Sequence, residues 1–116
     1  MSLVTSYTPF LYSPLLDLPI CRSTISCISI EYNKEIIAYA LIGRNDGEYE
    51  LQHLFVKEQY RRRGMGKFLL EKVIETFPNF YLIVGKENHI AFKLYVRNNL
   101  KIVRQTSKDY LMVFCS

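Results

Sequence analysis

The spacing of apolar residues changes abruptly near residue 60, and this change limits the folds open to the chain. Before it, residues 24–32, 35–42 and 48–56 are rich in β-branched and aromatic residues with partial alternation, which is typical of strands. After it, residues 64–77 are predicted as a helix because apolar residues recur there at helical spacing: Leu69, Leu70, Val73, Ile74 and Phe77. Pro78 ends that helix. Strands followed by a helix predict a mixed α/β domain.

The rest of the chain continues this mixed pattern. Residues 80–84 form a short apolar run, the pattern of a strand that is covered on both faces. Asn88 is a good N-cap for a second helix, and Asn98-Asn99 can end it because Asn tolerates the left-handed conformation. Residues 100–105 and 110–115 predict a final antiparallel pair. We therefore expect the α/β (α+β) class, with a mixed, mostly antiparallel, twisted sheet flanked by helices.

The third strand, residues 48–56, follows a loop predicted at residues 43–47 from their turn chemistry. Simple alternation divides its side chains into two sets: Leu51, His53 and Phe55 on one face, and Glu50, Gln52, Leu54 and Val56 on the other. On this pattern His53 is expected to pack under a helix.

Length and composition indicate one globular unit. The chain has 116 residues, of which 49% are apolar, and this is enough to bury a core. We expect a single domain over residues 1–116 in which residues 1–22 are a short, irregular segment, because Pro9, Pro14 and Pro19 interrupt it. No stretch is long and apolar enough to cross a bilayer, so no membrane contact is expected.

The cysteines and histidines suggest no redox or metal chemistry. Cys21, Cys27 and Cys115 show no paired short spacing, which argues against a disulfide scaffold and indicates a reducing, cytoplasmic compartment. We expect these thiols to be buried and unreactive. The two histidines lie at no ligand spacing from a cysteine, so no metal site is predicted.

A basic, glycine-containing turn joins the third strand to the first helix, with the sequence Arg61-Arg62-Arg63-Gly64-Met65-Gly66-Lys67. The first turn of a helix leaves backbone N–H groups unpaired and carries partial positive charge, and glycine lets an anion approach closely. On its own the turn predicts either a phosphate site or a solvated basic helix start. Because the cations gather at one turn and not over a groove-sized face, we expect no nucleic-acid partner.

Residues 54–70 resemble the central motif of the GNAT superfamily of N-acetyltransferases, Gln/Arg-x-x-Gly-x-Gly/Ala after a strand that ends in Val. Residues 88–95 are similar to the family's Asn-x-x-Ala-x-x-Phe-Tyr helix. The resemblance implies a GNAT-like acyltransferase fold whose two central parallel strands, ending near Val56 and Val84, are splayed. It also implies direct transfer of an acetyl group from acetyl-CoA to a primary amine.

The same resemblance implies a cofactor site in two parts. The diphosphate of acetyl-CoA would lie on the basic turn, which implies contacts from Arg61, Arg62, Arg63, Gly64, Met65, Gly66 and Lys67. The pantetheine arm would pair with the exposed edge of the preceding strand at Leu54, Phe55 and Val56, and Asn88 would contact the same arm. A main-chain N–H near Val56 would polarise the thioester carbonyl.

Two residues are candidates for proton transfer. Glu50 would act as general base, directly or through a water, although a strand glutamate can equally be a solvated surface residue and His53 is a second candidate base. Tyr95 would act as general acid toward the leaving thiolate of CoA. Its alternative is a core tyrosine on an amphipathic helix.

The chain departs from the family pattern at two places. Asn99-Leu100 replaces the usual Gly-Phe, which Asn tolerates. A short, proline-broken segment precedes the first strand where the family places a strand and two helices that wall the acceptor site. We therefore expect the pocket for the acceptor, a small-molecule or peptide amine, to be open, formed by a partner chain, or absent. A homodimer would complete the acceptor wall or cover exposed apolar surface such as Phe10, Leu11 and Tyr12. The alternative is a non-catalytic or weakly catalytic module that binds CoA or a partner protein.

Overall fold

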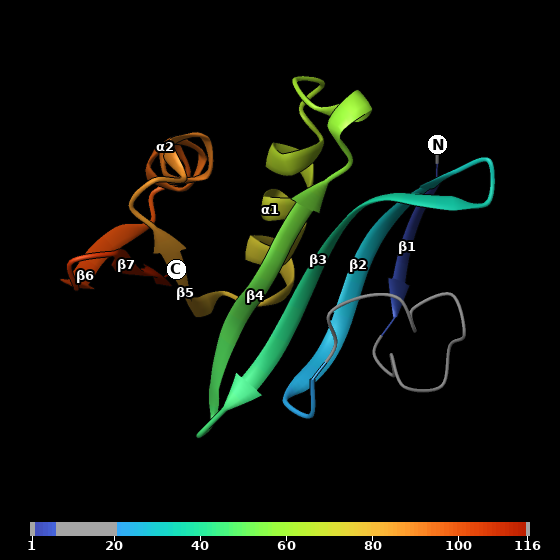
Figure 1. Cartoon of the computed structure of the whole chain (residues 1–116). Helices are drawn as coiled ribbons and strands as arrows, with labels where there is room; N and C mark the ends of the chain where they lie inside the picture. Colours follow the sequence, from blue (N-terminus) through green and yellow to red (C-terminus); the bar gives the residue numbers. More distant parts are fainter. Residues whose placement is uncertain (1, 7–20, 116) are drawn as a thin grey trace.

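The computed structural model describes residues 2–6 and 21–115, which form a seven-stranded sheet with two α-helices (Figure 1). In chain order its elements are β1 (Ser2–Ser6), β2 (Thr24–Tyr32), β3 (Glu35–Asn45), β4 (Glu48–Val56), the 3-10 helix η3 (Glu58–Tyr60), α1 (Met65–Thr76), β5 (Asn79–Gly85), α2 (His89–Arg97), β6 (Lys101–Gln105) and β7 (Asp109–Cys115). The strand order across the sheet is β1-β2-β3-β4-β5-β7-β6. The expected mixed, mostly antiparallel fold is confirmed.

The centre of the sheet is open at one end. Among the described strands, β4 and β5 form the parallel pair, and they pair only through Tyr49 with Phe80 and Glu50 with Tyr81. Beyond these residues β4 continues to Val56 and β5 to Gly85 without further pairing, and Figure 1 shows the two strands diverging. The predicted splay of the central parallel strands is therefore confirmed.

Both helices pack on one face of the sheet, which we call the inner face. Its core joins three groups of buried side chains: Ile28, Ala40, Ile42 and Leu51 from β2–β4, Leu69, Leu70 and Val73 from α1, and Val84, Tyr95 and Met112 around α2. Leu69 and Leu70 have no exposed surface, and truncating such a side chain to Ala costs about 2–5 kcal/mol. This packing fixes where α1 begins relative to the end of β4.

Three predictions about the elements were wrong. Ser2–Ser6, expected to be irregular, forms β1 against β2, because the prolines interrupt the sequence only after that point; Phe10, Leu11 and Tyr12 lie outside the described residues. The predicted loop at residues 43–47 is shorter, since β3 runs to Asn45 and only Asp46 and Gly47, with φ of 50° and 83°, make the turn.

The third error concerns β5, which was expected to be covered on both faces. Ile83 is 60% exposed, because its side chain lies on the opposite, outer face of the sheet while both α-helices of the described chain pack on the inner one.

Candidate functional site

The basic turn lies where β4 ends and α1 begins. Gly64 is the N-cap of α1 and has a φ of 79°, a left-handed conformation that side chains with a Cβ rarely adopt. A Cβ at this position would meet no heavy atom within 4 Å. The backbone at Gly64 is therefore both conformationally special and open to an approaching group.

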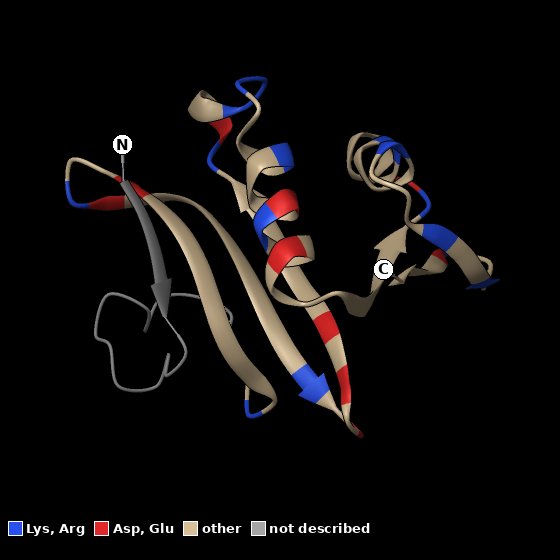
Figure 2. Ribbon diagram, turned by 180° about the vertical axis from the view of Figure 1, so that it is seen from behind, with Lys and Arg blue, Asp and Glu red and all other residues tan. Residues whose placement is uncertain are grey.

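The first turn of α1 presents unpaired donors and positive charge. Its first cross-turn bond runs from Phe68 N to the Gly64 carbonyl at 2.9 Å, no side chain caps the helix, and its first turn holds no acidic residue. The amides at positions 65–67 thus remain unpaired by helix geometry. Lys67, like Arg61, Arg62 and Arg63, is exposed, and Figure 2 shows Lys and Arg gathered in this loop and first turn. The arrangement suits an anion.

The predicted turn residues do not all contribute in the same way. Met65 is buried, so only its main chain can face a ligand. The Nε of Arg61 donates to the Val56 carbonyl at 2.8 Å, so this carbonyl, expected to face the pantetheine arm, already has a partner. Arg63 lies 5.7 Å over the Tyr60 ring. Arg61 therefore also fixes the turn to the end of β4.

The turn is packed directly against α2. A Cβ on Gly66 would lie 3.5 Å from Leu94 Cδ2 and 3.9 Å from Val56 Cγ2. At the start of α2, Asn88 accepts a hydrogen bond from Ala91 N at 3.3 Å through Oδ1, which confirms its predicted role as N-cap. Its exposed side-chain N–H groups have no partner among the described residues. The start of α1 thus packs against α2 and the end of β4, and Asn88 lies at the start of that second helix.

A β-bulge in β4 changes which face its residues occupy. Leu51 pairs with Ile42 but His53 pairs with Leu41, so Gln52 is an extra residue in the ladder. Leu51 therefore lies in the core with Leu54 and Val56, and not on the face of His53 as simple alternation predicted. His53 is exposed and not packed under a helix.

Glu50 lies on the outer face, at the residue where β4 last pairs with β5. It is half-buried, and its Oε1 accepts a hydrogen bond from Asn45 Nδ2 at 2.8 Å. The same nitrogen lies 3.4 Å from the Tyr81 hydroxyl. Sequence reasoning missed Asn45 and Tyr81, and only the register of β3, β4 and β5 could have indicated them.

Tyr95 lies in the core, but its hydroxyl has no hydrogen-bond partner in the described part of the chain. It is 7% exposed on α2, and burial raises the pKa of its phenol to about 12. Among the described residues, Ser26 Oγ is the one side-chain oxygen or nitrogen that is fully buried without a hydrogen-bond partner. The Tyr95 oxygen, which also has no partner among these residues, is therefore not fully buried and keeps some solvent contact. The structure thus agrees with a core position for Tyr95, and no described residue accepts its phenol proton.

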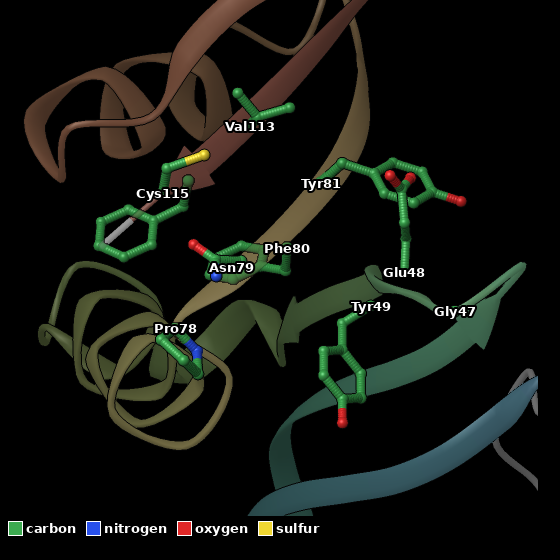
Figure 3. A pocket seen from close by; sticks show the side chains of 10 residues that line it. Gly47, Glu48, Tyr49, Pro78, Asn79, Phe80, Tyr81, Val113 and Cys115 are labelled. Atoms are coloured by element: carbon green, nitrogen blue, oxygen red, sulfur yellow. The ribbon is translucent and has the colours of Figure 1, made fainter.

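A pocket of about 310 Å³ lies at the other end of β4, away from the basic turn (Figure 3). Its walls come from the starts of β4 and β5 and the end of β7, and Glu48 and Tyr81 are among the residues that line it. The described residues contain no group of three His, Cys, Asp or Glu side chains that could hold a metal ion. They also contain no helix long and apolar enough to cross a membrane.

The prediction that the cysteines are buried holds for Cys27 alone. Cys21 and Cys115 are exposed. Hydrogen bonds from the side chains of Ser23 and Thr24 lower the pKa of the Cys21 thiol to about 7, whereas burial raises that of Cys27 to about 11. The error arose because Cys21 precedes the first ladder residue of β2 and Cys115 ends the chain's last strand.

Comparison with known proteins identifies relatives of this architecture. The sequence profile described as the Acetyltransferase (GNAT) family matches residues 4–99. The fold is similar to that of PaiA N-acetyltransferase from Thermoplasma acidophilum in complex with coenzyme A, with a TM-score of 0.71, 20% identity and coverage of 78% of this chain and 60% of that one.

Two further structures show the same similarity. A GNAT family acetyltransferase from Elizabethkingia anophelis with acetyl-CoA bound has a TM-score of 0.71 and 18% identity over 81% of this chain and 77% of its own. The ribosomal-protein-S18-alanine N-acetyltransferase from Escherichia coli has a TM-score of 0.69 and 21% identity over 82% of this chain and 70% of its own. These similarities establish the shared fold.

Proposed function

The chain belongs to the GNAT acetyltransferase family, and from this premise we propose that it is an N-acetyltransferase that transfers the acetyl group of acetyl-CoA directly to a primary amine. The observation that carries the proposal is the turn at Gly64, where a left-handed, unobstructed residue opens a helix with unpaired amides and four neighbouring cations. A diphosphate is the part of acetyl-CoA that such a turn suits best.

In this proposal the chain binds acetyl-CoA along the splay between β4 and β5. Arg61, Arg62, Arg63 and Lys67 surround the diphosphate, and the main chain at positions 64–67 donates to it. The arm follows the edge of β4 at residues 54–56, where β5 has already diverged, and Asn88 offers its free N–H groups. Glu50 lies six residues before Val56, roughly 20 Å along the strand, so a long extended arm would connect the two ends.

The proposed chemistry is one acyl transfer, with a proton removed from the acceptor before it and a proton given to the leaving thiolate after it. Glu50, directly or through a water, takes a proton from the acceptor ammonium, and the freed amine attacks the thioester carbonyl. Because the attacked carbonyl must lie within reach of Glu50, a main-chain N–H of β4 at the start of the splay stabilises the developing oxyanion, and not one near Val56, which lies roughly 20 Å along the strand. Tyr95 gives its proton to the departing thiolate, and its raised pKa keeps it protonated until then. His53, exposed on the outer face beside Glu50, is the alternative base.

The acceptor and the assembly belong to the same proposal. We propose an amine of a small molecule or peptide as acceptor, because Glu50 lies on the outer face, which the described helices leave open. A homodimer would complete the wall of that site. Three free cysteines favour the cytoplasm as its compartment.

Ligand binding and turnover test the proposal separately. Millimolar acetyl-CoA and free CoA should each raise the melting temperature by mass action, and release of free thiol should accompany acetylation of at least one amine in a panel of polyamines, amino acids and peptide N-termini. Binding without turnover on any amine would favour the alternative of a CoA-binding module. The absence of any thermal shift would exclude both.

A further inference from the structure

The Asn45 side chain joins three strands at the point where the sheet opens. It is the last residue of β3, and its Nδ2 donates to Glu50 Oε1 on β4 at 2.8 Å and lies 3.4 Å from the Tyr81 hydroxyl on β5. A side-chain amide carries two N–H donors, so one nitrogen can serve both partners. Glu50 and Tyr81 are also the last register pair of β4 and β5.

The contact leaves one carboxylate oxygen of Glu50 for chemistry. Oε1 is engaged by Asn45, whereas Oε2 has no partner among the described residues. The charged and titratable groups nearest to Glu50 in the register of this face are Glu48 and His53 on β4 and Tyr81 on β5, and Cys27 and Tyr39 lie farther along it. Arg44 lies on the inner face, 5.2 Å over the Tyr49 ring. Among the described residues, Asn45 is the side chain that donates to the Glu50 carboxylate.

We propose that Asn45 is a positioning residue, which holds the Glu50 carboxylate through Oε1 and turns its free oxygen toward the acceptor amine, with Tyr81 fixing the Asn45 amide from β5. The inference rests on the proposed function, because Glu50 is the base that it serves. Its physical basis is that a base must be held within hydrogen-bond reach of the proton it takes, and that a small misplacement of a catalytic group lowers the rate strongly.

Asn45 is not needed to hold the β3–β4 hairpin together. The turn consists of Asp46 and Gly47, both with positive φ, and Asn45 pairs with Glu48 to close it. Two-residue turns with two positive-φ residues match the twist of the strands and fix the register by themselves. Loss of the Asn45 side chain should therefore leave the hairpin in place.

The test measures the environment of the Glu50 carboxylate and the turnover of the enzyme in the same variants. Asn45→Ala removes the donor, and Asn45→Asp keeps the shape but places a second carboxylate against Glu50. The Glu50 carboxyl carbon is followed by NMR in protein labelled at glutamate and is assigned with Glu50→Gln. Asn98→Ala is the matched control, because Asn98 Nδ2 also donates at 2.8 Å, but to the Leu94 carbonyl on α2.

We expect the NMR signal of the Glu50 carboxyl carbon to move in Asn45→Ala and further in Asn45→Asp, because the first variant loses the donor and the second also brings a like charge against the carboxylate. In both variants kcat should fall about 10-fold while CoA affinity is unchanged. Tyr81→Phe should give a smaller shift in the same direction, and Asn98→Ala none.

An unchanged Glu50 carboxyl signal in both Asn45 variants would overturn the proposal, as would a loss of melting temperature without a change in kcat. A changed signal in a protein that acetylates no amine would refute the proposed function and the catalytic role of the pair together. The NMR measurement itself needs no substrate, so the two failures are distinguishable.

Discussion

The two ends of β4 carry different kinds of site. At its C-terminal end, the basic turn is built from the main chain, through the left-handed Gly64 and the unpaired amides of α1. At its N-terminal end, Glu50 is held by side chains from neighbouring strands, with Asn45 at 2.8 Å. The first end suits binding of an anion, and the second suits movement of a proton.

This difference determines how each end tolerates change. A main-chain site depends on the backbone conformation, so it is lost when the φ of Gly64 becomes unfavourable, whatever the charge around it. A side-chain site depends on individual atoms, so it can lose its chemistry without any change in backbone. Variants at the N-terminal end should therefore alter rate, and variants at the C-terminal end should alter affinity.

The largest effect is expected for Glu50→Gln. This change removes the base but keeps the size of the side chain and can retain the contact with Asn45. General base catalysis contributes ~10²–10⁴-fold, so kcat should fall by that range, with the CoA-induced thermal shift unchanged. Glu48→Gln, on the same strand and among the residues that line the neighbouring pocket, is the control. Equal losses in the two variants would contradict the assignment of Glu50.

Gly64→Val should separate binding from chemistry at the opposite end. A β-branched residue in the left-handed conformation costs about 1–2 kcal/mol, and relief of that strain would turn the amides away from the ligand. We expect the affinity for CoA, measured by calorimetry, to fall at least ~10²-fold, since two charge-assisted hydrogen bonds at about 1.5 kcal/mol each account for that factor.

Gly64→Asn is the matched variant for this position, because Asn adopts the left-handed conformation more readily. It should keep the melting temperature and much of the CoA affinity. If Gly64→Val bound CoA as tightly as the wild type, the main-chain site would be wrong.

The same difference explains how far the sequence predicted the molecule. The turn could be predicted because its parts are contiguous: a strand ending at Val56, a glycine, and a helix with apolar residues at regular spacing. The helix end at Asn98-Asn99 was predicted for the same reason, and Asn99 has a positive φ. Local backbone chemistry determines such features.

The N-terminal end of β4 could not be predicted in the same way. The extra residue, Gln52, reverses the alternation, so that Leu51 and His53 occupy opposite faces. No local signal marks this bulge, because it depends on pairing with Leu41 and Ile42 of β3. The contact of Asn45 with Tyr81 spans 36 positions and exists only once the register of the sheet is known.

Tyr95→Phe should have an intermediate effect on turnover. The hydroxyl has no partner among the described residues, so its loss should barely change the melting temperature. If Tyr95 is the general acid, kcat should fall by about 10², the lower end of the usual range, because solvent reaches the same oxygen. A full rate on the true acceptor would assign the proton to another donor.

The pH dependence of stability provides a second measurement on Tyr95. Its pKa of about 12 in the folded protein exceeds the value of 10 for a free tyrosine, so the folded state binds more protons between these pH values. The stabilisation is complete below pH 10 and is lost as the pH rises toward 12. Urea unfolding in this range should therefore show a steeper decline for the wild type than for Tyr95→Phe.

The smallest effect is expected at Gln52, the bulge residue, and it is measured through Cys21. Gln52 Nε2 lies 3.5 Å from Cys21 Sγ and donates to Ser23 Oγ at 2.8 Å, and Ser23 in turn hydrogen-bonds the thiol at 3.1 Å. Because these contacts lower the Cys21 pKa to about 7, iodoacetamide should modify Cys21 before the buried Cys27 at neutral pH.

Gln52→Ala removes one donor and loosens another, which raises the Cys21 pKa and lowers the thiolate fraction at pH 7. The rate of alkylation, followed by mass spectrometry from pH 5 to 9, should fall about two- to threefold at neutral pH and recover above pH 8. Because the ladder around Gln52 depends on backbone pairing, turnover should change little. If alkylation of Cys21 keeps its rate in Gln52→Ala, the side-chain contacts at the bulge contribute nothing to the reactivity of the thiol.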